Sequence, residues 1–178
     1  MTASLKARAE SGERLMGVLL RMPGEELVEM AAVAGFDFVL VDCEHGPADV
    51  VALRQHVALA GVHRVPVVVR VGESDPGMIL RALDQGAEGI LAPHIDSAPD
   101  ARALVSAAHY PPIGIRGFAT YSRAGRFGQT DAGRGSSPNR YFAISEWEAR
   151  AQERSADDSK LSIHFRLYAS LSGAKQGW

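Results

Sequence analysis

The chain has 178 residues, of which 46% are hydrophobic and 22% are charged, and its formal net charge is −2. This balance fits one soluble globular domain and provides no strong electrostatic field for binding nucleic acid or an anionic membrane. A single cysteine, Cys43, excludes an internal disulfide framework. The sequence contains no apolar run of about 18 residues, which is the length that a membrane span needs.

In chain order, residues 1–15 are polar and charged and lack the apolar core of a signal peptide, so we expect a cytoplasmic protein. Short apolar runs then alternate with longer amphipathic ones as far as residue 110. The apolar runs predict strands, and the amphipathic runs predict helices that begin at a proline or end at a glycine in several cases. The predicted strands are 15–21, 36–43, 65–71 and 89–95, and the predicted helices are 23–35, 48–61, 76–86 and 98–110.

Four strand–helix units in a row predict a parallel α/β fold. Periodicity alone allows either an open doubly wound sheet or part of a TIM-type (β/α)8 barrel. No strand-to-helix turn carries a G-x-G-x-x-G or Walker pattern, which disfavours a nucleotide-binding sheet.

The sequence changes character after Tyr110. Residues 111–142 are rich in Gly, Arg, Ser and Pro and predict a long loop. Residues 144–160 are polar and predict at most a weak helix, whereas residues 161–171 alternate strictly between apolar and polar side chains, as in a half-exposed strand. We therefore expect two segments, 1–142 and a divergent tail at 143–178.

Ionisable residues gather where the predicted strands end, which is the edge at which parallel α/β proteins bind ligands. His45 follows two carboxylates there and is either a general acid/base or a hydrated rim residue. Arg70 ends an apolar strand, where its guanidinium would bind either an anionic ligand or a neighbouring carboxylate. On composition alone, Cys43 is expected to be a packing residue and Asp84 a solvated helix residue.

Four motifs then carry a resemblance to a known family. They are GFDFVLVDCEHGP at 35–47, PVVVRV at 66–71, LDQGAEGILAPHI at 83–95 and YPPIGIRGF at 110–118. In this order and spacing the chain resembles, from about Leu15 to about Phe142, the class II metal-dependent pyruvate aldolases of the HpcH/HpaI aldolase/citrate lyase β-subunit family. The resemblance implies a (β/α)8 barrel, of which this chain would hold about four units. It also implies a lyase that cleaves 4-hydroxy-2-oxoacids to pyruvate and an aldehyde.

The resemblance further implies roles for individual residues. His45 would be the acid/base, Asp84 the carboxylate that pairs with it, and Arg70 the group that binds the pyruvate oxygen and stabilises the enolate. Glu44 would lie in the outer shell of a divalent metal, Mg²⁺, Mn²⁺ or Co²⁺. The family's metal-holding motifs, Q-I-E and G-P-x-D-L-S, do not occur in the chain, so no metal ligand is identified. We therefore expect metal binding and turnover to be impaired.

A half barrel would leave open sheet edges and an uncovered apolar face. This predicts a homo-oligomer or self-association through the open barrel, with a small oxoacid as the only other partner. The alternative to an enzyme is a non-catalytic half barrel that acts as a binding or assembly subunit. The changed composition after residue 142 suggests the further hypothesis that the tail arose from a shift of reading frame.

Overall fold

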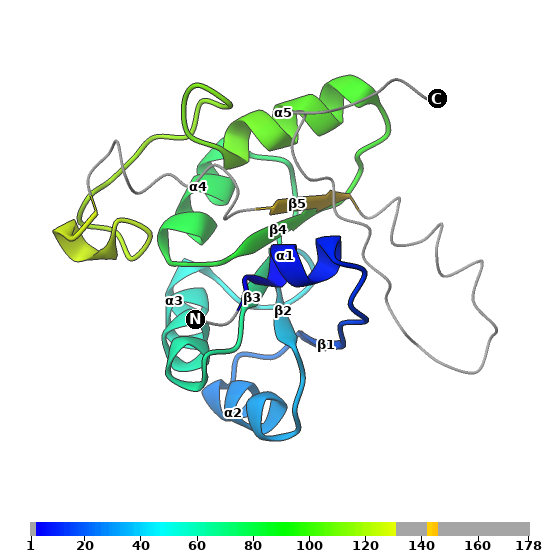
Figure 1. The fold of residues 1–178 in the computed structure, drawn as a ribbon, viewed down its shortest axis with the longest axis vertical. Helices are drawn as coiled ribbons and strands as arrows, with labels where there is room; N and C mark the ends of the chain where they lie inside the picture. The colour runs from blue at the N-terminus through cyan, green and yellow to red at the C-terminus, as the bar shows by residue number, and fades with distance from the viewer. Residues whose placement is uncertain (1–2, 131–141, 146–178) are drawn as a thin grey trace.

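The computed structural model describes residues 3–130 and 142–145, which form a parallel sheet with helices (Figure 1). The strands are β1 (Gly17–Leu20), β2 (Phe38–Asp42), β3 (Val67–Arg70), β4 (Gly89–Ala92) and β5 (Phe142–Ser145). The helices are α1 (Leu5–Glu10), α2 (Glu25–Val33), α3 (Val50–His63), α4 (Pro76–Asp84) and α5 (Ala98–Ala108), and η1 (Arg126–Gly128) is a 3-10 turn. Within the described residues, no helix has the length and apolar character needed to cross a membrane.

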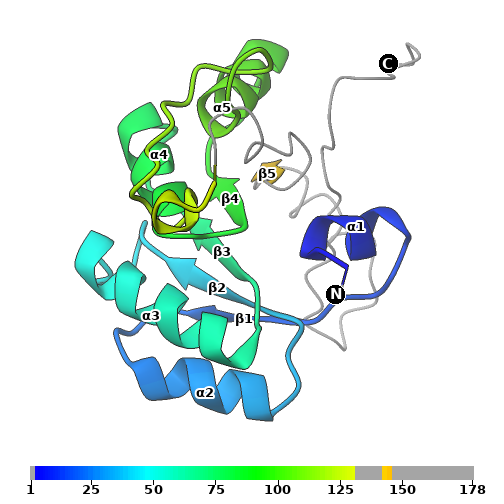
Figure 2. The same cartoon turned by 60° about the vertical axis from the view of Figure 1, so that its left-hand side comes forward.

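The strand order distinguishes between the two folds that the sequence left open. The five strands are all parallel and lie in the order β1-β2-β3-β4-β5. Helices α2 to α5 lie together on one side of this sheet (Figure 2). A doubly wound sheet instead reverses its strand order at a switch point and carries helices on both faces. The described residues therefore form a sector of a (β/α) barrel.

The predicted strand–helix units are confirmed, and each predicted strand contains the observed one. Helix α4 begins at Pro76 after the N-cap Asp75, whose carboxylate accepts two backbone N–H bonds, and Gly86 follows the helix with a φ of 104°. Helix α3 differs from the prediction, because it continues past the expected end at Gly61 to His63. Arg64 then takes the left-handed conformation that a terminal glycine would usually supply.

Two elements differ from the sequence-based expectations. Strand β5 pairs in parallel with β4, so the expected loop ends in a strand, and the first two residues of the expected helix 144–160 are extended. Helix α1 forms in the segment that seemed only polar, and its Leu5 is buried. Residues 111–130 are irregular apart from η1, as predicted. The rest of the expected helix, at 146–160, and the expected strand 161–171 lie outside the described residues.

The side chains of the strands point alternately to the two faces of the sheet and pack into two apolar clusters. The larger cluster fills the space between the sheet and helices α2 to α5, and includes Val39, Val41, Val67, Val69 and Ile90. The smaller one lies on the opposite face, called the inner face below, and consists of Leu5, Phe38, Leu40, Val68 and Leu91. Because side chains alternate along a strand, Asp42 and Arg70 continue the inner-face rows of β2 and β3. The fold therefore places these two charged residues where a barrel has its interior.

Candidate active site

The carboxyl ends of β1, β2 and β3 bring four charged side chains together. Arg21 directly follows β1, Asp42 is the last residue of β2, Glu44 lies two residues further on, and Arg70 is the last residue of β3. The sheet register sets Asp42 opposite Arg70. We call these four residues, together with His45, the inner rim. The rim lies at the end of a parallel sheet where barrel enzymes bind their ligands.

Arg70 and Asp42 form a two-pronged ion pair. Arg70 Nε donates to Asp42 Oδ1 at 3.0 Å, and Arg70 Nη2 donates to Asp42 Oδ2 at 2.7 Å. The Asp42 carboxylate is fully buried, and Arg21 Nε lies 3.8 Å from its Oδ2. Burial acts to raise the pKa of Asp42, but the Arg70 hydrogen bond and two backbone N–H bonds outweigh it and lower the pKa below its ordinary value. The carboxylate therefore stays ionised at neutral pH.

Glu44 connects Arg70 to His45. One carboxylate oxygen of Glu44 lies 3.3 Å from Arg70 Nε, as an ion pair without the alignment of a hydrogen bond. The other oxygen lies 3.6 Å from His45 Nε2. The His45 side chain is 64% exposed and thus open to a ligand, whereas that of Glu44 is 10% exposed. The structure therefore brings together three of the residues that the sequence singled out.

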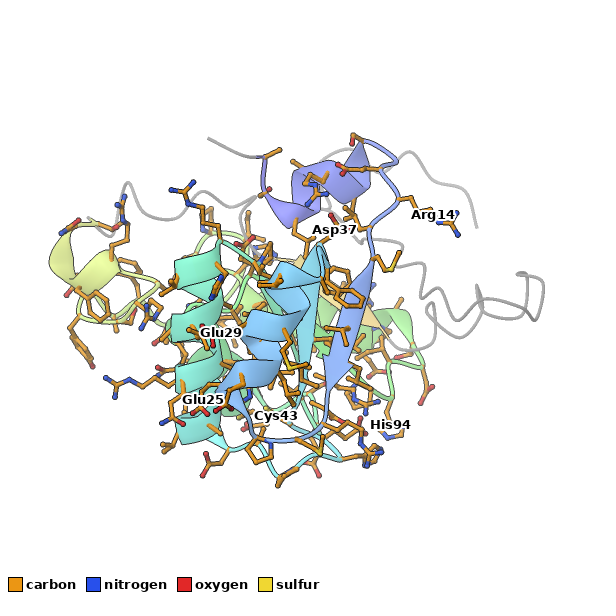
Figure 3. All side chains as sticks on the ribbon, turned by 90° about the horizontal axis from the view of Figure 1, so that it is seen from below. Arg14, Glu25, Glu29, Asp37, Cys43 and His94 are labelled. Carbon is orange, nitrogen blue, oxygen red and sulfur yellow. The ribbon has the colours of Figure 1, made fainter. Side chains whose placement is uncertain are left out.

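Cys43 lies at the same end of the sheet but has a packing role. Its side chain contacts the larger apolar cluster, and Figure 3 shows it at the end of the molecule that also holds His94, away from Asp37. Burial, with the nearby charges of Asp42 and Asp49, raises the pKa of the Cys43 thiol to about 11. A neutral thiol is a poor nucleophile and a poor metal ligand, which agrees with the packing role expected from the sequence.

Asp84 is not near His45 within the chain. It ends α4, the helix that runs from the carboxyl end of β3 back to the amino end of β4, so the two residues lie at opposite ends of the sheet. Its carboxylate accepts a hydrogen bond of 2.7 Å from Arg116 Nη2. The Arg116 guanidinium is buried and stacks over the Tyr110 ring at 4.5 Å. Asp84 is thus a half-buried, paired carboxylate, which corrects the solvated helix residue that composition alone suggested.

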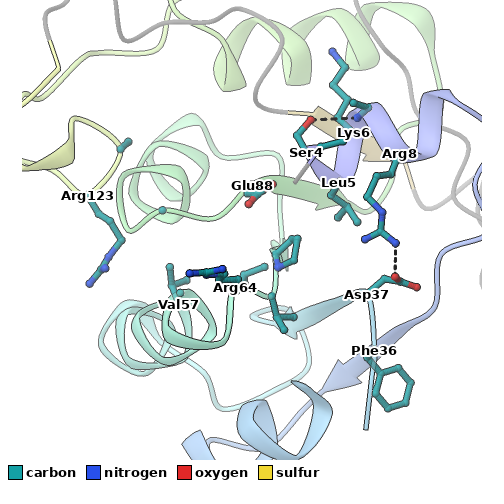
Figure 4. A pocket seen from close by; sticks show the side chains of 18 of the residues that line it. Ser4, Leu5, Lys6, Arg8, Phe36, Asp37, Val57, Arg64, Glu88 and Arg123 are labelled. Atoms are coloured by element: carbon teal, nitrogen blue, oxygen red, sulfur yellow. Dashed lines mark hydrogen bonds and ion pairs between the residues drawn. The ribbon is translucent and has the colours of Figure 1, made fainter. Parts of the chain in front are cut away.

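A hollow of about 1090 Å³ lies at the amino end of the strands, on the far side from the inner rim (Figure 4). Helix α1, the end of α3 and the turn around Gly86 line it, and Arg8 pairs with Asp37 at its edge. Arg64 enters it from the carboxyl end of α3, where a cation stabilises the helix dipole. The hollow contains none of the predicted site residues, and Arg8 and Arg64 have structural explanations.

The metal expected from the resemblance finds no ligand set in the described part of the chain. Among residues 3–130 and 142–145, no group of three or more His, Cys, Asp or Glu side chains is arranged to hold a metal ion. One Glu44 oxygen is buried and accepts no hydrogen bond, but Arg70 already lies beside it. A single carboxylate shared with a guanidinium does not fit a divalent ion.

Sequence reasoning missed the parts played by Asp42 and Arg116. Asp42 was visible as the last residue of a strand, and its spacing of two from Leu40 puts it on the inner face. Its partner is 28 residues away, and only the register of β2 against β3 identifies it. Arg116 lies in the irregular segment after α5 and carries no periodic signal, so only the structure reveals that it holds Asp84.

Comparison with known proteins agrees with this fold. The sequence profile of the HpcH/HpaI aldolase/citrate lyase family matches residues 16–157. A pyruvate aldolase of Rhizobium etli is 38% identical over 143 residues, which cover 80% of this chain and 53% of the relative. A hydroxypyruvate/pyruvate aldolase of Sagittula stellata is 39% identical over 126 residues, which cover 69% of this chain and 49% of the relative. The crystal structure of an HpcH/HpaI aldolase/citrate lyase family protein from Burkholderia cenocepacia has a TM-score of 0.75 and 31% identity, covering 81% of this chain and 59% of that one.

The chain therefore belongs to the HpcH/HpaI aldolase/citrate lyase family, as the four sequence motifs indicated. It spans about half the length of the curated relatives that it matches. The family match continues to residue 157, beyond the Phe142 at which the resemblance was expected to end. Strand β5, at Phe142–Ser145, lies inside this extension.

Proposed function

We propose that the inner rim is the enolate-handling part of an aldolase site, and that the intact enzyme is a carbon–carbon lyase acting on 4-hydroxy-2-oxoacids. The observation that carries this proposal is the joined set His45, Glu44 and Arg70 at the carboxyl ends of parallel strands. The names of the relatives point to pyruvate and hydroxypyruvate as the oxoacid part.

The rim residues suit the two demands of aldol cleavage. His45 would take the proton of the 4-hydroxyl group, so that the C3–C4 bond breaks and the aldehyde leaves. The electrons of that bond form the C2=C3 double bond of the pyruvate enolate, whose negative charge lies on the C2 oxygen. Arg70 would stabilise this oxygen with its guanidinium. His45 would then return the proton to C3, which completes pyruvate and restores the imidazole.

The charges of the rim explain why a cation would help this reaction. Arg21 and Arg70 carry two positive charges, and Asp42 and Glu44 carry two negative ones, so their formal sum is zero. An anionic oxoacid gains little from a neutral cluster. The divalent metal expected from the resemblance would add positive charge and Lewis-acid stabilisation at the same oxygen, with ligands from outside the described residues.

The proposed pairing of His45 with Asp84 requires two chains. Because the two residues lie at opposite ends of one sheet, only Asp84 of a second copy could reach the rim. This supports a homo-oligomer in which the end of α4 from one copy faces the inner rim of another. Exposed apolar residues in the segment beside Arg116, namely Ile113, Ile115, Tyr121 and Phe127, fit such a contact.

Cleavage of a simple 4-hydroxy-2-oxoacid, such as 4-hydroxy-2-oxoglutarate, tests the proposal. Pyruvate release would be followed by lactate dehydrogenase coupling, with Mg²⁺, Mn²⁺ or Co²⁺ added and with a chelator as the reference. We expect the rate of cation-dependent pyruvate release to fall on the order of 100-fold in the Arg70→Lys variant, because lysine lacks the planar, forked donors that arginine presents to the enolate oxygen. Release that ignores this substitution would contradict the assignment of Arg70.

A second candidate is a non-catalytic binding or assembly subunit. It is favoured by the ion pairs that Arg70 already makes with Asp42 and Glu44, which give this guanidinium a structural role without any ligand. It predicts that no cation supports pyruvate release and that the chain forms a stable complex, which light scattering would detect. Turnover above the blank would exclude it.

A further inference from the structure

One fully buried carboxylate at the inner rim contacts both parts of the proposed site. Asp42 Oδ1 accepts the backbone N–H of Glu44 at 3.0 Å and that of His45 at 3.1 Å. The same carboxylate accepts the two guanidinium bonds from Arg70. Four donors therefore converge on a side chain that has no exposure to solvent.

We propose that Asp42 is a positioning residue, whose single carboxylate fixes the Arg70 guanidinium and the turn that carries His45 in one mutual arrangement. This inference rests on the proposed function for its catalytic meaning. Asp42 touches neither substrate nor reacting atoms in this account, and it acts only through the two residues that do.

The geometry of the turn supports this role. Gly46 passes so close to the strand ends that a Cβ there would lie 2.5 Å from the Asp42 carbonyl oxygen and 3.0 Å from that of Arg21. The backbone at 42–46 thus lies close against β1 and β2, and the Asp42 carboxylate binds the amides of Glu44 and His45. These bonds fix the backbone from which the His45 side chain extends.

The chemistry of the pair explains why an aspartate is needed. A carboxylate presents two acceptor oxygens to the fork of donors on a guanidinium, which fixes both the position and the plane of Arg70. A side-chain amide keeps one acceptor but turns a donor toward Arg70 Nη2. An Asp42→Asn variant can therefore keep the turn while spoiling the contact with Arg70, whereas Asp42→Ala removes both.

The test compares these two variants with Asp96→Asn, the same chemical change at an exposed carboxylate near the end of β4. The readout is the exchange of pyruvate methyl protons for deuterium, followed by NMR with Mn²⁺-free Mg²⁺ present. We expect kcat to fall roughly 10- to 100-fold in Asp42→Asn and further in Asp42→Ala, the range seen when a group that orients a ligand residue is removed. Asp96→Asn should leave kcat and KM unchanged.

A double-mutant cycle separates positioning from a general loss of structure. On an Arg70→Lys background, which keeps a cation and a residual rate, Asp42→Asn should change the rate by less than about twofold, because the partner it positions is already altered. An Asp42→Asn loss as large as in the wild-type background would overturn the proposal.

A second readout does not depend on activity. Amide hydrogen exchange at Glu44 and His45 should remain slow in Asp42→Asn and become fast in Asp42→Ala, with circular dichroism unchanged. Slow exchange in both variants would also overturn the proposal. If the wild-type chain exchanges no pyruvate protons, the proposed function fails, and the amide measurement still decides whether Asp42 holds the turn.

Discussion

Replacing Arg116 with methionine tests how firmly the buried pair with Asp84 is built into the fold. The Arg116 residue is 3% exposed and the Asp84 side chain 18% exposed, and their hydrogen bond is 2.7 Å. Removing one partner of a buried pair costs about 3–5 kcal/mol, and the lost stacking on Tyr110 adds about 0.5–2 kcal/mol. Asp84 keeps some contact with water, so we expect a total loss of about 3 kcal/mol.

Urea unfolding provides the assay. With a slope of about 2 kcal/mol per molar, a loss of this size lowers the midpoint by about 1.5 M. Arg102→Met, the same change at an exposed position on α5, should alter the free energy of unfolding by less than about 0.5 kcal/mol. In a cycle with Asp84→Asn, the coupling energy should exceed about 1 kcal/mol. Additive effects of the two substitutions would refute the reasoning, because they would mean that the pair contributes nothing as a pair.

Three further predictions concern acid stability, thiol reactivity and the inner face. The pKa of Asp42 is lowered in the folded chain, so the ionised carboxylate stabilises the fold above the unfolded pKa of about 3.9, and this stabilisation is lost as the pH falls below that value. The midpoint of thermal unfolding should therefore fall less steeply between neutral pH and a pH of about 3 in Asp42→Asn than in the wild type, whereas Asp96→Asn should behave like the wild type. Cys43, with its pKa raised to about 11, should react with iodoacetamide far more slowly at neutral pH than a free cysteine does, and fast labelling would show that the thiol is not buried. Leu5→Ala should lower the free energy of unfolding by about 2–4 kcal/mol, because it opens a cavity under α1. The exposed control Val33→Ala should lower it by less than about 0.5 kcal/mol, and equal effects would mean that α1 does not cover the inner face.

The repeated units could be predicted from the sequence because their signals are local. Each of the strands β1 to β4 is an apolar run up to its last residue, and Pro76 and Gly86 bracket a helix by their own backbone preferences. Helix α1 could not be found in this way, because six residues give less than two turns and Leu5 is its only large apolar residue. Strand β5 is defined by its pairing with β4, a contact between residues far apart in the sequence, such as Gly89 and Phe142.

The positions of His45 and Arg70 at the strand ends were predictable, but the contacts that connect them were not. Strand-end position and the family motifs identified His45 and Arg70, and the structure places them on one rim. The partner of Arg70 depends on sheet register, which a one-residue slip would change, and no local pattern fixes it. Asp84 was assigned to the site only by the family resemblance. Its place at the end of α4 shows that a single chain cannot bring it to His45.

In the proposed function, the inner rim stabilises a pyruvate enolate through Arg70. Exchange of pyruvate methyl protons in D₂O measures formation of that enolate directly, without any aldehyde substrate. We expect exchange above the blank in the wild-type chain with a divalent cation, and a loss on the order of 100-fold in Arg70→Lys. The matched Arg81→Lys change on the exposed face of α4 should have no effect. Exchange that is absent from the wild type, or equal in the two variants, would contradict the claim.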